Sequence, residues 1–127
     1  MEFEKIIDNL KNKVYHPIYL LQGEEPYYID RVSDYIENNV LTAAEKGFNQ
    51  TIFYGKDSDV QNIAESALRF PMMADKQVII VKEAQSLKKI EDLGAYAEKP
   101  MASTLLVLNF KYKKLDARTK LAKEIKK

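Results

Sequence analysis

Four short apolar runs divide the chain and predict the strands of a sheet. They are PIYLLQ at 17–22, NQTIFYG at 49–55, KQVIIVK at 76–82 and STLLVLNF at 103–110. The first run does not alternate strictly between apolar and polar residues, which is typical of a strand buried on both faces of a parallel sheet.

The segments around the first strand carry apolar residues at helical spacing. Before the strand these residues are Phe3, Ile6, Ile7, Leu10 and Val14. After the strand they are Tyr28, Val32, Tyr35 and Ile36. Pro26 suits the first turn of the second helix, where its missing N–H is no loss. We therefore expect Gly23 to form a turn from strand to helix.

Three further helices are predicted from capping residues. Ser58 begins a capping-box pattern, and the helix that follows should stop by Phe70, because Pro71 disfavours helical geometry in the residue before it. Ser86 can cap another helix, and Asp116 can cap the last one. The apolar residues of the helix after Ser86 are Leu87, Ile90 and Leu93.

Alternating strands and helices of this length predict an α/β fold, with a four-stranded parallel sheet and helices on both faces. The chain has 127 residues, of which 46% are hydrophobic, and this suffices for one domain with a buried core. We expect residues 1–127 to form that single domain.

Composition excludes several kinds of site. The chain has no cysteine and one histidine, so disulfides, thiolate metal sites and His-based metal clusters are not expected, and no cofactor is predicted. No apolar run approaches the roughly 20 residues that span a bilayer, and the acidic start does not resemble a signal sequence, so we expect a cytoplasmic protein without membrane contact.

Positive charge is concentrated at the end of the chain. Residues 111–127 contain 8 Lys and Arg but only 2 Asp and Glu. This basic segment either approaches DNA phosphates or forms the solvated face of a helix. No aromatic residue follows Tyr112 to stack on bases.

The turn at Gly23 stands where a nucleotide-binding fold keeps its phosphate loop, but the GxxxxGK[ST] motif is missing. Glu24 and Glu25 place negative charge where an anion would sit, and Pro26 removes a backbone N–H. Lys82 stands at the end of the third strand in place of the acidic residue that would organise magnesium. We expect neither nucleotide nor metal to bind at this turn.

Two polar features near the same edge remain open to interpretation. Asn109 ends the fourth strand, where related ATPases keep a residue that senses the terminal phosphate. Glu24, Glu25 and Glu83 are either solvated charges near helix N-termini or the acidic pocket of a phosphoacceptor domain. A divergent NTPase or phosphoacceptor domain is therefore the alternative hypothesis for function.

The chain combines a nucleotide-binding architecture with the loss of the phosphate and magnesium ligands. In this it resembles the N-terminal domain of the delta subunit of the bacterial DNA polymerase III clamp loader. The stretches that carry the resemblance are PIYLLQGEEPYYID, FNQTIFYGKD, LRFPMMADKQVIIVKEAQSLKK, KPMASTLLVLNF and KKLDARTKLAKEIKK. The resemblance implies an AAA+ ATPase-like fold that does not bind ATP. It also implies a helical domain and a collar domain, both of which we expect to lie outside this sequence.

The resemblance further implies a non-enzymatic role in DNA replication. The domain would bind the sliding clamp, the beta subunit, and help to open the ring for loading onto primed DNA. Its other partners would be the remaining clamp-loader subunits, with DNA contacted indirectly.

In the family, the clamp-binding element is a pair of bulky apolar residues in the turn before the third strand. Here that pair falls on Met72 and Met73, with Phe70 and Pro71 beside them. Four apolar residues in a row are also unusual in a turn, where polar residues are expected. The alternative is that Phe70 and one methionine fold back into the core under the loop.

Overall fold

The computed structural model, which describes residues 2–112, 115 and 118–125, contains a four-stranded sheet. All three strand pairings are parallel, in the order β1-β4-β3-β2. The strands are β1 (Ile18–Gly23), β2 (Gln50–Tyr54), β3 (Gln77–Lys82) and β4 (Thr104–Lys111). The predicted α/β class and the four predicted strands are confirmed.

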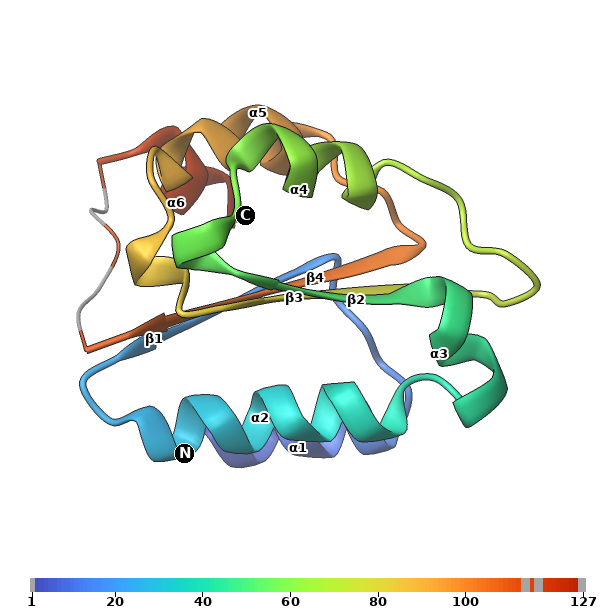
Figure 1. Cartoon of the computed structure of the whole chain (residues 1–127). Coiled ribbons are helices and arrows are strands. Elements are labelled where there is room, and N and C mark those ends of the chain that lie inside the picture. Colours follow the sequence, from blue (N-terminus) through green and yellow to red (C-terminus); the bar gives the residue numbers. More distant parts are fainter. Residues whose placement is uncertain (1, 113–114, 116–117, 126–127) are drawn as a thin grey trace.

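Helices cover both faces of the sheet (Figure 1). On one face lie α1 (Glu2–Lys11) and α2 (Pro26–Asn39). On the other lie α4 (Val60–Ala67), α5 (Gly94–Glu98) and α6 (Lys120–Ile125). A shorter helix, α3 (Ala43–Asn49), leads directly into the start of β2. This arrangement gives the sheet an apolar partner on each side.

Alternate residues of the central strands serve two separate cores. Val78 and Ile80 pack with α1 and α2, whereas Ile79 and Val81 pack with the helices of the opposite face. All four side chains are at most 1% exposed. Burying a Val or Ile side chain contributes roughly 1.5 to 3 kcal/mol, so the unbroken apolar run of β3 stabilises both layers.

The start of α4 differs from the prediction. Ser58 does not cap this helix; the cap is Asp59, whose carboxylate accepts the backbone N–H of Asn62 at 2.8 Å. Ser58 has an extended backbone and lies one residue before this cap, so the expected capping box is wrong by one position. The helix ends at Ala67, consistent with the predicted stop before Pro71.

The single helix predicted after Ser86 is also wrong. Ser86 ends the 3-10 turn η2 (Ala84–Ser86), and a second 3-10 turn, η3 (Ile90–Leu93), leads into α5. Glu83 and Lys89 both have left-handed backbone conformations, which interrupt regular helix geometry. The three apolar residues expected on the helix are nevertheless buried: Leu87, Ile90 and Leu93.

One further difference and one untested prediction concern helix starts. The sequence reasoning missed α3, although Thr42 and Glu45 form a complete capping box at its start. The predicted cap at Asp116 lies outside the described residues. In the described part, the hydroxyl of Thr119 accepts the backbone N–H of Ala122 at the start of α6.

None of the helices in the described part of the chain has the length and apolar content that a membrane crossing requires.

Candidate functional site

The carboxyl ends of the strands form the edge of the sheet where a nucleotide-binding fold keeps its phosphate loop. The sequence of this chain lacks the motif at that position. Gly23 ends β1 with φ at 139°, a backbone conformation that favours glycine, and α2 begins at Pro26. Glu25 occupies the N-cap position of α2, but its side chain makes no capping hydrogen bond. The strand-to-helix turn is confirmed, and its helix start carries a proline where a phosphate loop would present an N–H.

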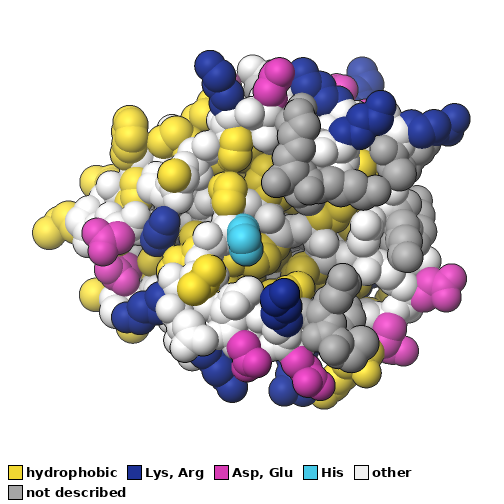
Figure 2. Space-filling model, turned by 180° about the vertical axis from the view of Figure 1, so that it is seen from behind, with side chains coloured by type: hydrophobic (Ala, Val, Ile, Leu, Met, Phe, Trp, Pro, Cys, Tyr) yellow, Lys and Arg dark blue, Asp and Glu magenta, His cyan; other side chains and the backbone are white. Residues whose placement is uncertain are grey.

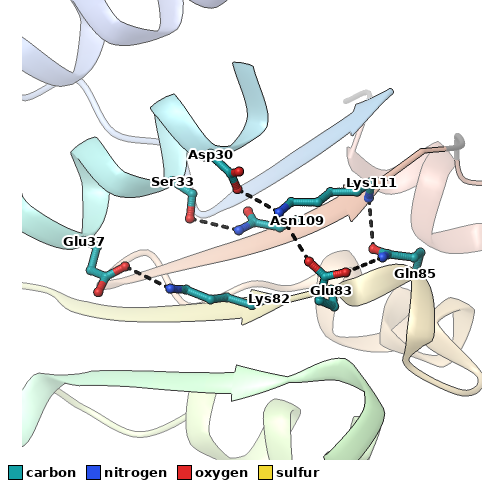
Figure 3. A network of polar contacts seen from close by, with 8 residues as sticks. All are labelled: Asp30, Ser33, Glu37, Lys82, Glu83, Gln85, Asn109 and Lys111. Atoms are coloured by element: carbon teal, nitrogen blue, oxygen red, sulfur yellow. Dashed lines mark hydrogen bonds and ion pairs between the residues drawn. The ribbon is translucent and has the colours of Figure 1, made fainter. Parts of the chain in front are cut away.

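A lysine of the chain itself occupies the middle of this edge (Figure 3). The Nζ of Lys111, at the end of β4, lies 2.9 Å from Asp30 Oδ1 and 3.3 Å from Glu83 Oε2. Gln85 closes the network by donating to Glu83 at 2.8 Å and accepting the backbone N–H of Lys111 at 3.0 Å. Glu83 is thus paired with an internal cation.

The charge state of Lys111 follows from these contacts. Burial of its side chain alone would lower its pKa, but the hydrogen bonds and negative charges of Asp30 and Glu83 outweigh burial and raise that pKa. Lys111 therefore stays protonated between the two carboxyl groups. Within the described residues, no group of three or more His, Cys, Asp or Glu side chains has an arrangement that could hold a metal ion.

Two further polar side chains near this edge, Lys82 and Asn109, also make internal contacts (Figure 3). Lys82 lies 3.5 Å from the carboxylate of Glu37 on α2. Asn109 is 2% exposed and donates to the hydroxyl of Ser33 at 3.0 Å, so its amide points into the layer under α2. Its Oδ1 has no hydrogen-bond partner within the described part of the chain. This geometry supplies internal ion pairs where a nucleotide site needs phosphate and magnesium ligands.

The opposite, amino-terminal edge of the sheet carries residues 68–76, which we call the apolar turn. Phe70 is 78% exposed, Met72 is 60% exposed and Met73 is 98% exposed. Pro71 between them is half-buried. The structure therefore brings all the predicted partner-binding residues onto one exposed turn, and neither methionine folds back into the core.

Exposed apolar surface continues from the apolar turn onto α3. Phe48, near the end of that helix, is 74% exposed. The next residue, Asn49, hydrogen-bonds to the backbone of Met72. Figure 2 shows hydrophobic side chains projecting at its left edge, the end of the molecule where α3 and the apolar turn lie. Sequence reasoning missed Phe48 because it missed α3.

Buried polar side chains hold the beginning of the apolar turn. The Nε2 of Gln77, the first residue of β3, donates to the carbonyls of Ser66 at 2.9 Å and Arg69 at 2.8 Å. The hydroxyl of Thr104 donates to the carbonyl of Ala67 at 2.8 Å. These bonds engage carbonyls at the end of α4 and just after it, where regular helical hydrogen bonding stops. The start of the exposed turn is therefore held in place by buried hydrogen bonds.

Apart from Lys111 at the carboxyl edge, much of the described part of the basic segment lies in α6, which packs beside α5. Its described residues include Lys120, which is paired with Glu98 on α5 at 3.1 Å. Both side chains of this pair are more than half exposed, so the contact adds little stability. A contact between the basic segment and DNA stays a prediction.

Comparison with known proteins extends these observations. The family model described as "DNA polymerase III, delta subunit" matches residues 19–127. The chain is 33% identical over 129 residues to the DNA polymerase III subunit delta of Bacillus subtilis (strain 168), and the match covers 94% of the chain and 37% of that protein. Its fold matches the DNA clamp loader delta protein of Bacillus subtilis with a TM-score of 0.84 and 29% identity, over 98% of the chain and 40% of that one. The chain thus spans roughly two fifths of the length of these relatives.

Proposed function

The chain belongs to the DNA polymerase III delta subunit family, and from that premise we propose that it is the subunit's clamp-binding module. It binds the sliding clamp, the beta subunit, through the apolar turn and helps to open the ring for loading onto primed DNA. Met72 and Met73 enter an apolar pocket of the clamp, with Phe70 and Pro71 at its rim. A flexible, unbranched methionine adapts well to such a pocket.

The observation that carries this proposal is the conformation of Met73. Its side chain is 98% exposed, and its backbone has φ at 56°, in the left-handed region. This conformation costs a residue other than glycine roughly 1 to 2 kcal/mol. An apolar side chain that gains almost no burial and lies on a strained backbone contributes nothing evident to folding. Backbone strain of this kind clusters at functional sites.

The opposite edge of the sheet supports a role without nucleotide hydrolysis. Lys111 is committed to Asp30 and Glu83, and Lys82 is paired with Glu37. We therefore propose an AAA+-like domain in which internal ion pairs have replaced the nucleotide and its metal. Contacts with the other clamp-loader subunits, and indirectly with DNA, belong to the parts of the longer relatives that this chain does not span.

Isothermal titration of the chain with the sliding clamp from the same source tests the proposal. We expect binding by the unaltered chain and a loss of roughly 30- to 1,000-fold in affinity for the variant with both Met72→Ala and Met73→Ala. Small interfaces concentrate their energy in a few buried side chains, and truncating an anchoring pair costs about 2 to 4 kcal/mol.

Two controls separate a lost contact from a lost fold. The melting temperature of the double variant should change little, because exposed substitutions usually alter stability by less than about 0.5 kcal/mol. Tyr54→Ala removes an exposed aromatic residue from the carboxyl end of β2, at the other edge of the sheet, and should leave clamp affinity unchanged. Clamp binding retained by the double variant would contradict the proposal.

A further inference from the structure

We propose that Asn49 is a positioning residue, which holds the apolar turn in the conformation that meets the clamp. The inference rests on the proposed function, because it concerns how the same turn is presented. Asn49 is the last residue of α3, and it reaches across 23 sequence positions to the middle of the turn. It would act through the backbone of Met72 without touching the clamp.

The side chain of Asn49 makes a paired contact with one residue of the turn. Its Oδ1 accepts the backbone N–H of Met72 at 2.6 Å, and its Nδ2 donates to the carbonyl of Met72 at 2.8 Å. The same Nδ2 also donates to the carbonyl of Glu45, one turn earlier in α3, at 3.0 Å. Asn49 is 2% exposed. Both polar atoms of its side chain are therefore hydrogen-bonded. Together they bond to the N–H and the carbonyl of Met72, as the backbone of a neighbouring β-strand would.

This contact requires the chemistry of an asparagine. One acceptor and one donor must point in the same direction from a short side chain that starts at the helix end. Aspartate keeps the acceptor but cannot donate to the Met72 carbonyl, and alanine removes both groups. Because both bonds reach main-chain atoms of Met72, replacing the methionine side chain leaves the contact intact.

The position of the contact links it to binding. Met72 is fixed at both of its backbone polar groups, and the next residue is Met73, with its left-handed backbone. Met72 is largely exposed, so water can replace Asn49 at its N–H and carbonyl when the side chain is removed. The fold would then survive, but the turn would occupy other conformations. The measured affinity for the clamp then falls in proportion to the fraction of molecules whose turn keeps the conformation that binds.

The test is a cycle of variants titrated with the sliding clamp below their melting temperatures. Asn49→Ala should weaken binding about tenfold, since each of two lost hydrogen bonds contributes a few-fold preference for the bound conformer. The same change in the Met72→Ala, Met73→Ala background should have no further effect, because the turn then carries no anchor. Exchange of the Met72 amide hydrogen should become faster in Asn49→Ala. If Asn49 only stabilised the fold, the effect of Asn49→Ala on clamp binding would not depend on the two methionines.

Ser33→Ala is the matched control. It also removes a buried side-chain hydrogen bond, the one to Asn109, but it lies on α2 below the other end of the sheet. It should lower the melting temperature and leave clamp affinity unchanged.

The outcomes distinguish the two levels of the hypothesis. If Asn49→Ala binds the clamp as tightly as the unaltered chain while the methionine variant does not, the positioning role is overturned and the proposed function stands. If Asn49→Ala weakens binding equally with and without the methionines, or if Ser33→Ala weakens it as much, the positioning role is also overturned. If the unaltered chain does not bind the clamp, the proposed function itself fails.

Discussion

Gly55, directly after β2, is the position at which the smallest substitution should do the most damage. A Cβ added there would lie 2.2 Å from the carbonyl oxygen of Glu83, and 3.1 Å from both the Glu83 carbonyl carbon and the backbone nitrogen of Leu87. These are main-chain atoms, which cannot rotate away as a flexible side chain would. Gly55→Ala therefore forces the segment after β3 to move.

The magnitude follows from the closeness of this contact. Adding a methyl group to a well-packed site typically costs about 1 to 3 kcal/mol, and displacement of main-chain atoms places Gly55→Ala at the upper end. For a domain of this size, each kcal/mol lowers the melting temperature by roughly 4 °C. We therefore expect a decrease of about 10 °C. The shift should also disturb the ion pair that Glu83 makes with Lys111.

Gly47→Ala is the matched control, because the chemical change is identical and the surroundings differ. Gly47 lies within α3, and a Cβ added there meets no heavy atom within 4 Å. Alanine is favoured over glycine inside a helix by roughly 0.5 to 1 kcal/mol, so this variant should melt a few degrees higher. Thermal unfolding followed by circular dichroism measures both. The reasoning is refuted if Gly55→Ala melts at or above the unaltered chain, or if both variants shift in the same direction.

Three further predictions follow from other features. Met73→Gly should raise the free energy of unfolding by about 0.5 to 1 kcal/mol in urea titration, because it relieves a left-handed backbone, yet it should weaken clamp binding; a loss of stability would contradict this reasoning. Calorimetry with ATP and Mg²⁺ should show no binding at the Gly23 turn, and micromolar affinity would restore the NTPase hypothesis. Burial raises the pKa of Tyr19 and Tyr96, and the ion pairs of Lys111 raise its pKa despite burial. As the pH rises, these groups therefore lose their protons in the unfolded chain before they do in the folded chain. The free energy of unfolding should hold up to about pH 10 and fall above it. A rise above about pH 10 would refute the assignment of raised pKa values.

The strands of this protein could be read from its sequence because both faces of the sheet are apolar. Every residue of β3 from Val78 to Val81 is buried, so an uninterrupted apolar run sufficed to place the strand. Gly23 and Pro26 likewise determine their turn by local backbone chemistry, in which tertiary contacts have little part. The absence of a phosphate-loop motif is a property of the sequence alone.

The helix boundaries were less predictable from the sequence. Ser58 and Asp59 are both good caps, and residue preferences do not choose between neighbours. Glu83 and Lys89 break the segment after β3 by adopting left-handed conformations that nothing in their chemistry requires. The two 3-10 turns bury Ala84, Ile90 and Leu93 in the core, so these breaks depend on tertiary packing.

Only the tertiary structure decided the contacts that hold the apolar turn and the ion pairs at the carboxyl ends of the strands. Asn49 and Met72 are 23 positions apart, and their contact exists because parallel strands bring the start of β2 and the turn before β3 to the same edge. Lys111 meets Asp30 and Glu83 because β4 lies between β1 and β3, so residues from three segments converge at one strand end. Sequence patterns report the chemistry of neighbouring residues along the chain, whereas these contacts depend on the order of strands in the sheet, which no local pattern encodes.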